Sequence, residues 1–229
     1  AVENGKPLFL EQHLNRIEKA ADFLGLGSCR QRGLTEEKIE EYLDMYDISL
    51  KKHEALKVIL SAENMFFQMR NNPYVEESYT QGLRAEISKV RRNETSPLVY
   101  HKTLNYGDCI LEKRAAMAAG IHEMIFINTK GQISEGTVSN IFFVRKNTVY
   151  TPQLSCGLLP GILRSYIMER FPVTETIIYP DELVYYDECF VTNSLMGIMP
   201  VKQLGNICFP HRTKADELRE IYENEKMFW

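Results

Sequence analysis

Apolar residues recur with helical spacing near the start of the chain. Between residues 10 and 24 they stand three or four positions apart, which predicts an amphipathic helix that ends at Gly25 or Gly27. A second helix is predicted directly after Thr35. A threonine at this position can accept a hydrogen bond from a free N–H group of the first turn, and the apolar residues that follow again share one face.

Short apolar runs bounded by turn residues predict strands. Residues 56–59 and 65–69 are two such runs, joined by a predicted turn at residues 61–64, and residues 83–90 are a third. Residues 1–96 are therefore expected to form a small α/β domain of two helices on a sheet. The chain begins on Ala1 without a methionine. We expect that further residues precede it, including the first strands of this domain.

Ser96-Pro97 is the expected domain boundary, because proline interrupts local structure. Residues 97–229 are predicted to form a larger, strand-rich domain. Its helices are expected at residues 108–119, 161–171 and 215–225, and its strands at residues 124–127, 141–144, 149–151, 189–192 and 199–204.

Composition narrows the classes of function. The net charge of −4 and the pI of about 5.8 provide no basic field, so nucleic acid is not an expected partner. No apolar stretch approaches the roughly 18 residues of a membrane span. The five cysteines are widely spaced and odd in number, without a C-x-x-C pair, which favours free thiols in a reducing cytoplasm over disulfides or a zinc site.

Two segments carry residues that suit a covalent aldehyde cofactor. Lys102 stands in the mostly uncharged run of residues 100–106, and Glu135 is flanked by small residues. A lysine bonds an aldehyde carbon only after it loses its proton, and desolvation favours that loss by lowering the amine pKa. We expect apolar neighbours to shield Lys102, namely Leu104, Tyr106, Ile110 and Leu111. Taken singly, both residues have simpler interpretations, a surface lysine and a solvated turn glutamate.

Five motifs occur in order along the chain: H-x-x-R at residues 13–16, K-T-L-N-Y at 102–106, S-E-G-T-x-S-N at 134–140, L-P-G-I-x-R at 159–164 and T-N-S-L-M at 192–196. Together they resemble the class IV aminotransferase family. These pyridoxal-phosphate (PLP) enzymes include branched-chain and D-amino-acid aminotransferases and aminodeoxychorismate lyase. The resemblance implies the two-domain α/β (α+β) fold of the D-amino-acid aminotransferase type, with a small α/β domain and a larger strand-rich pseudo-barrel domain. It also implies PLP in the cleft between the domains and a homodimer.

The resemblance assigns roles around the cofactor ring. Lys102 resembles the lysine that forms the Schiff base and acts as general base, and Glu135 resembles the carboxylate that pairs with the ring nitrogen. Tyr106 either binds the ring hydroxyl or is a core tyrosine. Ser139 and Asn140 are expected to line the same pocket.

Other residues are expected to bind the phosphate. Arg16 resembles the family's phosphate-binding arginine, whose guanidinium can donate two parallel hydrogen bonds. Many relatives have threonine where this chain has Leu163, so a hydroxyl contact is lost there while a backbone contact survives, and Ser194 could replace the hydroxyl. The remaining phosphate candidates are Gly161 and Ile162 at the start of a helix, and Asn193 in a second loop that simple turn chemistry would also explain.

The reaction type follows less directly from the motifs. The run around T-N-S-L-M is similar to that of aminodeoxychorismate lyase, which favours the lyase over an aminotransferase of branched-chain or D-amino acids. A non-catalytic ligand-binding relative is the alternative from another class. A basic strand end could receive the substrate carboxylates, although a solvated sheet edge is the commoner explanation of such a cluster. Its residues are Arg84, Lys89, Arg91 and Arg92.

Overall fold

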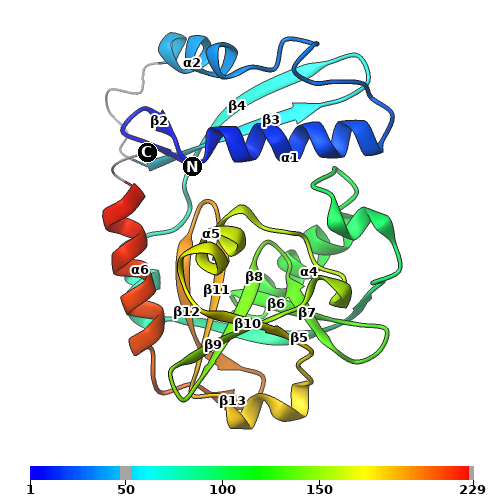
Figure 1. The fold of residues 1–229 in the computed structure, drawn as a ribbon. Helices are drawn as coiled ribbons and strands as arrows, with labels where there is room; N and C mark the ends of the chain where they lie inside the picture. Colours follow the sequence, from blue (N-terminus) through cyan, green and yellow to red (C-terminus); the bar gives the residue numbers. More distant parts are fainter. Residues whose placement is uncertain (47–52, 227–229) are drawn as a thin grey trace. The chain divides into compact units, whose positions relative to one another are not determined.

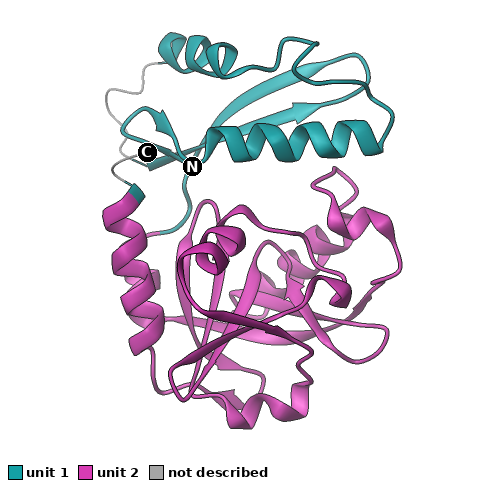
Figure 2. Ribbon diagram, viewed as in Figure 1, with its two compact units in different colours: residues 1–74, 226–229 teal, residues 75–225 magenta. Residues whose placement is uncertain are grey.

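The computed structural model describes residues 1–46 and 53–226, and its chain forms two compact units (Figures 1 and 2). The first contains residues 1–74 and the second residues 75–225. Both units combine helices with a sheet, as the sequence predicts. In the described part of the chain, no helix has both the length and the apolar character needed to cross a membrane.

The first unit packs helices against a four-stranded antiparallel sheet in the order β2-β1-β3-β4. Its helices are α1 (Leu10–Phe23) and α2 (Glu36–Met45), and its strands are β1 (Val2–Glu3), β2 (Lys6–Pro7), β3 (His53–Leu60) and β4 (Met65–Asn71). A tight turn joins β1 and β2, in which Asn4 and Gly5 both have positive φ angles, 49° and 83°.

Local chemistry explains both helices of this unit. Thr35 caps α2, since its side chain accepts the backbone N–H of Lys38 at 3.3 Å. Gly25 follows the end of α1 with φ of 66°, a left-handed conformation that glycine adopts readily. The apolar faces meet in one core cluster of fully buried side chains, which includes Leu14, Leu34 and Ile39. The two predicted helices are confirmed.

The second unit is built around a nine-stranded mixed sheet that curls strongly (Figure 1). The strand order is β10-β9-β8-β11-β12-β5-β6-β7, with β13 paired to β12. The strands are β5 (Leu83–Arg92), β6 (Glu123–Asn128), β7 (Ile133–Gly136), β8 (Asn140–Arg145), β9 (Thr148–Pro152), β10 (Val173–Thr176), β11 (Glu188–Asn193), β12 (Gly197–Leu204) and β13 (Ile207–Cys208). Phe142 of β8 lies opposite Phe190 of β11, and their stacked rings, 4.9 Å apart, lie in the core.

Four α-helices and three 3-10 helices accompany this sheet. The α-helices are α3 (Glu76–Gln81), α4 (Gly107–Ala118), α5 (Ile162–Arg170) and α6 (Thr213–Glu225), and the 3-10 helices are η1 (Pro97–Tyr100), η2 (Leu154–Cys156) and η3 (Pro180–Tyr185). The expected helices and strands of this half are confirmed to within a few residues. The short elements α3, β7, β10 and β13 were not predicted, because they have too few residues to show a hydrophobic periodicity.

The division of the chain differs from the boundary expected at Ser96-Pro97. The structure divides the units between Tyr74 and Val75, because β5 belongs to the sheet of the second unit. This strand pairs in parallel with both β6 and β12. Parallel pairing joins segments that are distant in sequence, so a local signal cannot reveal it. Pro97 instead begins η1 within the connection from β5 to β6.

The five cysteines are free, as the sequence predicts, and four of them are buried. Burial, with a hydrogen bond to Glu18, raises the pKa of Cys29 to about 11, and burial raises that of Cys189 well above its ordinary value. We therefore expect a thiol reagent at pH 8 to modify Cys208 rapidly and the other four only after unfolding. The C208S variant should lose the fast phase, and rapid labelling of a second thiol in native protein would contradict this assignment.

Candidate active site

The centre of the site is a buried ion pair between two strands of the second unit. Glu135 of β7 is 5% exposed, and its Oε1 accepts a hydrogen bond from the guanidinium of Arg92 at the end of β5. The same guanidinium lies 4.7 Å from the centre of the Phe126 ring and contacts the Cys109 sulfur at 3.6 and 3.7 Å. The arginine is therefore held over an apolar surface and faces the carboxylate.

The surroundings of Glu135 shift the pKa of its carboxyl group in opposite directions. Burial raises the pKa of the Glu135 carboxyl above its ordinary value. The charge of Arg92, the backbone N–H of Leu159 on Oε2 at 3.0 Å, and the charge of Lys102 all lower it. Desolvation is the largest effect, so the group keeps its negative charge most readily beside a positive partner.

Lys102 lies between η1 and α4, close enough to Glu135 for its charge to lower the pKa of that carboxyl. The structure thus brings together the two residues that the motifs single out. The expectation that apolar neighbours shield Lys102 is wrong, because Lys102 is exposed, as are Leu104 (60%) and Leu111 (63%). The side of α4 that faces the protein carries Cys109 and Ala116, so Leu111 lies on the outer side.

The start of α5 has the form expected of an anion site. Gly161 is its N-cap and no side chain caps the helix, so N–H groups of the first turn are available to a ligand. The side chains of Ile162 and Leu163 are buried, which leaves only their backbone for such a contact. Leu163 is 1% exposed. Its core position accounts for an apolar side chain there.

The second loop, at residues 193–196, is organised by Asn193. Its Oδ1 accepts the backbone N–H groups of Leu195 and Met196, both at 2.8 Å, and its Nδ2 donates to the carbonyl of Val138 at 3.1 Å. The amide therefore shapes its own loop and ties that loop to the segment after β7. Ser194 lies beside it, half-buried.

Ser139 and Asn140 bind the protein's own groups. The hydroxyl of Ser139 donates to Glu123 Oε2 at 2.9 Å, and the amide of Asn140 donates to the carbonyl of Leu159 at 2.9 Å. Tyr106 is half-buried and is the N-cap residue of α4. Arg16 lies on α1 in the first unit, with one guanidinium nitrogen 3.5 Å from His13 Nδ1.

The expected cluster of basic residues on β5 is not formed. Arg84 and Arg91 are seven positions apart on this strand, roughly 23 Å at about 3.3 Å per residue. Arg91 is exposed and donates to the carbonyl of Ser88 at 3.2 Å, whereas Arg92 turns inward to Glu135. Successive strand residues point to opposite faces, so the Arg91-Arg92 pair could have indicated that one of them faces the interior.

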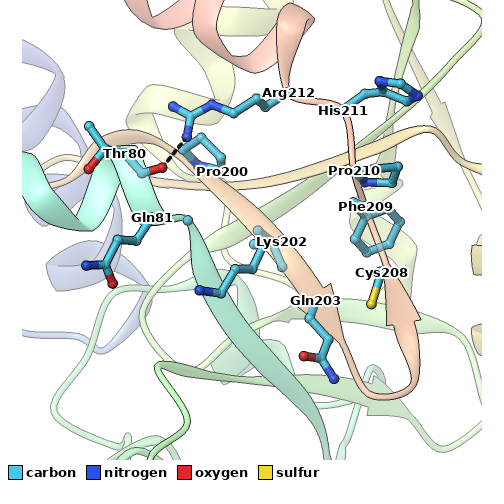
Figure 3. Close-up of a pocket in the computed structure, with 12 residues that line it drawn as sticks. Thr80, Gln81, Pro200, Lys202, Gln203, Cys208, Phe209, Pro210, His211 and Arg212 are labelled. Atoms are coloured by element: carbon cyan, nitrogen blue, oxygen red, sulfur yellow. Dashed lines mark hydrogen bonds between the residues drawn. The ribbon is translucent and has the colours of Figure 1, made fainter.

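A cavity of about 340 Å³ lies elsewhere in the second unit (Figure 3). It is lined by residues of α3, β12 and β13 and by the segment before α6. Arg212 donates to the Thr80 carbonyl there at 2.9 Å and pairs with Asp216. The cavity lies where Val201 pairs with Leu83, at the opposite end of β5 from Arg92. None of the residues that line it belongs to the candidate active site.

Across the described ranges 1–46 and 53–226, no group of three or more His, Cys, Asp or Glu side chains could hold a metal ion.

Gly161 offers a direct test of the packing at this site. A Cβ built on Gly161 would overlap Asn140 Oδ1, so we expect G161A to displace Asn140 and to destabilise the protein by about 1–3 kcal/mol. The matched control is G107A, because a Cβ on Gly107 meets open space and its φ is not positive. Chemical denaturation should show a lower midpoint for G161A and an unchanged midpoint for G107A. Equal midpoints for both variants would mean that Asn140 does not pack on Gly161.

Comparison with known proteins identifies the family of this chain. The sequence profile of the amino-transferase class IV family matches residues 1–204. A probable branched-chain-amino-acid aminotransferase of Thermotoga maritima is 28% identical, over 97% of this chain and 81% of the relative. The aminodeoxychorismate lyase of Bacillus subtilis is 24% identical, over 96% and 82%. The crystal structure of a putative 4-amino-4-deoxychorismate lyase from Legionella pneumophila superposes with a TM-score of 0.82 at 26% identity, over 98% of this chain and 88% of the other. The chain belongs to the class IV aminotransferase family, whose members are PLP-dependent aminotransferases and lyases.

Proposed function

We propose that this protein is an aminodeoxychorismate lyase, which converts 4-amino-4-deoxychorismate to p-aminobenzoate and pyruvate with PLP as its cofactor. The observation that carries the PLP chemistry is the position of Lys102, whose charge acts on the buried Glu135. The lyase branch is supported by the T-N-S-L-M run, which includes the loop that Asn193 organises. Two of the relatives compared above carry the lyase name.

The residues present fit PLP. A pyridine nitrogen that carries a proton would be a second positive partner for Glu135 beside Arg92, and Arg92 and Leu159 fix the orientation of that carboxylate. The uncapped start of α5 suits the phosphate. We propose that Ser194 completes the phosphate site, and that Tyr106 binds the ring hydroxyl.

Lys102, Glu135 and Arg92 have different roles in the proposed reaction. When bound, PLP supplies a ring that draws electrons away from the substrate's α carbon. Lys102 would hold the cofactor and would take the proton from that carbon as general base. Glu135 would pair with the ring nitrogen, and Arg92 prevents the carboxylate from turning away.

We also propose that the protein is a cytoplasmic homodimer. Exposed apolar side chains lie on α4 and just before it, beside Lys102. They are Leu104, Ile110, Leu111 and Met117. A second copy that covers them would also lower the hydration of the Lys102 amine. Light scattering during gel filtration should give twice the mass of the chain.

The lyase reaction has a direct assay. Purified protein, loaded with PLP, is incubated with aminodeoxychorismate without any keto acid, and pyruvate is measured with lactate dehydrogenase. We expect pyruvate and p-aminobenzoate in equal amounts. If the substrate is consumed only when a keto acid is added, the lyase assignment is rejected while PLP chemistry at Lys102 stands.

An aminotransferase of branched-chain or D-amino acids is the second candidate. The Thermotoga maritima relative favours it, since it covers nearly the whole chain. Leucine or D-alanine, each with 2-oxoglutarate, should then yield glutamate. A non-catalytic relative is disfavoured because both Lys102 and Glu135 are present and the charge of Lys102 lowers the pKa of the buried Glu135 carboxyl. Such a protein would have no need of a lysine charge beside this carboxylate.

A further inference from the structure

We propose that Glu123 is a positioning residue that holds in place the three segments on which PLP binding depends. Glu123 begins β6, is 1% exposed and has no part in the reaction outlined above. Its effect on the cofactor rests on the proposed function. Its effect on the protein's own segments does not.

Glu123 is a hydrogen-bond acceptor for the chain that follows Glu135. Its Oε1 accepts the backbone N–H and the hydroxyl of Thr137, the N–H at 3.1 Å, and also the backbone N–H of Met124 at 3.1 Å. Its Oε2 accepts the hydroxyl of Ser139 at 2.9 Å. A buried carboxylate with this many donors is well satisfied and fixes the backbone that supplies them.

The packing around Glu123 leaves this segment little freedom. A Cβ on Gly136 would overlap the Ser139 hydroxyl and lie 3.1 Å from the Glu123 carboxyl carbon. Glycine at 136 is therefore required for the segment to close over the carboxylate. Lys113 of α4 lies 3.9 Å from Glu123 Oε1 and partly compensates the buried charge.

The segment at residues 137–140 is in turn bonded to two further loops. The carbonyl of Val138 accepts the amide of Asn193, which organises the loop that contains Ser194. The amide of Asn140 donates to the carbonyl of Leu159, just before the start of α5. The N–H of Leu159 then donates to Glu135 Oε2. One carboxylate thus supports the ring partner, the α5 start and the Asn193 loop through hydrogen bonds that the backbone of residues 137–140 connects.

The chain offers a matched control in Glu188. This glutamate is also buried, at 5% exposure, and its oxygens accept the backbone N–H groups of Lys214 and Ala215 at 3.0–3.1 Å. It holds the first turn of α6, and within the described residues these side-chain hydrogen bonds reach none of the segments above. Replacing Glu188 by alanine removes buried hydrogen bonds of the same kind but none that involve the candidate active site.

The experiment compares E123A, E123Q and E188A with the unchanged protein. Hydrogen–deuterium exchange is measured on apoprotein for peptides that cover residues 137–140, 157–163 and 193–196, and PLP affinity is measured by equilibrium dialysis. We expect E123A to lose protection in all three peptides and to bind PLP about 10- to 100-fold more weakly, the range typical of residues that orient ligating groups. E188A should lose protection only near residue 213 and change PLP affinity less than about threefold.

E123Q should restore most of the protection and affinity, because glutamine keeps one acceptor oxygen for Thr137 and its NH₂ group can donate to the Ser139 hydroxyl. The proposal is overturned if E123A leaves the peptides at 157–163 and 193–196 protected, or if E188A weakens PLP binding as much as E123A does. If the unchanged protein does not bind PLP, the proposed function fails, and the exchange pattern alone decides the role of Glu123.

Discussion

The K102A variant is expected to reduce turnover of aminodeoxychorismate by at least about 10³-fold. A positioned general base contributes roughly 10²–10⁴-fold, and alanine also removes the covalent link to the cofactor. The fold should be unaffected, since the Lys102 side chain is exposed and a surface substitution changes stability by about 0.5 kcal/mol or less. Pyruvate release under saturating PLP measures the effect.

Lys202 provides the control for this variant. It is an exposed lysine of the same unit, on β12 beside the cavity of Figure 3, at the opposite end of β5 from Arg92. K202A should keep nearly full activity. If K102A retained a tenth of the activity or more, or if K202A lost as much as K102A, Lys102 would not be the general base.

The R92M variant is expected to cause the largest loss of stability, about 3–5 kcal/mol near neutral pH. It leaves Glu135 buried without its guanidinium, and an uncompensated buried charge has a cost of this size. Urea denaturation measures the loss. The neighbouring R91M is the matched control, because Arg91 is exposed and should change the free energy of unfolding by less than about 1 kcal/mol.

The loss in R92M should depend on pH in a defined direction. The pKa of Glu135 in the folded chain already lies above its ordinary value because of burial, and removal of Arg92 raises this pKa further. The folded state then binds a proton more tightly than the unfolded state, so stability falls as pH rises above the unfolded value of about 4.3. The difference between R92M and the unchanged protein should be small near pH 4 and grow toward pH 8. A pH-independent difference would mean that the two side chains do not interact.

The double variant R92M/E135Q separates charge from packing. With both charges removed, most of the lost stability should return, because replacement of a whole buried ion pair by neutral groups is often close to neutral. Recovery of less than about 1 kcal/mol would assign the loss in R92M to packing against Phe126 instead.

Much of the fold follows from local sequence signals. Thr35 and Gly25 act through neighbours in the chain, and they form the predicted helix cap and the predicted helix end. The domain boundary follows from parallel pairing of β5 with β6 and β12, which joins residues that are distant in sequence. A proline at 97 is equally compatible with a linker and with the 3-10 turn that it begins.

The motifs identified the residues at the centre of the candidate site but not the residues that hold them in position. Lys102 and Glu135 could be selected because motif order is a property of the sequence. Arg92 was considered only for the substrate carboxylates, and Glu123 was not singled out, because the roles of both depend on which face of a strand they occupy. The alternation along β5, and a single acidic residue at the start of an otherwise apolar β6, are the signals that could have identified them. The exposure of Lys102 could not be predicted, because its apolar neighbours on and before α4 point outward and do not cover it.

Reduction with borohydride gives the most direct test of the PLP assignment. The protein is incubated with PLP, reduced, digested and mapped by mass spectrometry. The account predicts one phosphopyridoxyl group per chain, on the peptide that contains Lys102, and none in K102A. Stoichiometric labelling at any other lysine, with Lys102 unmodified, would contradict it.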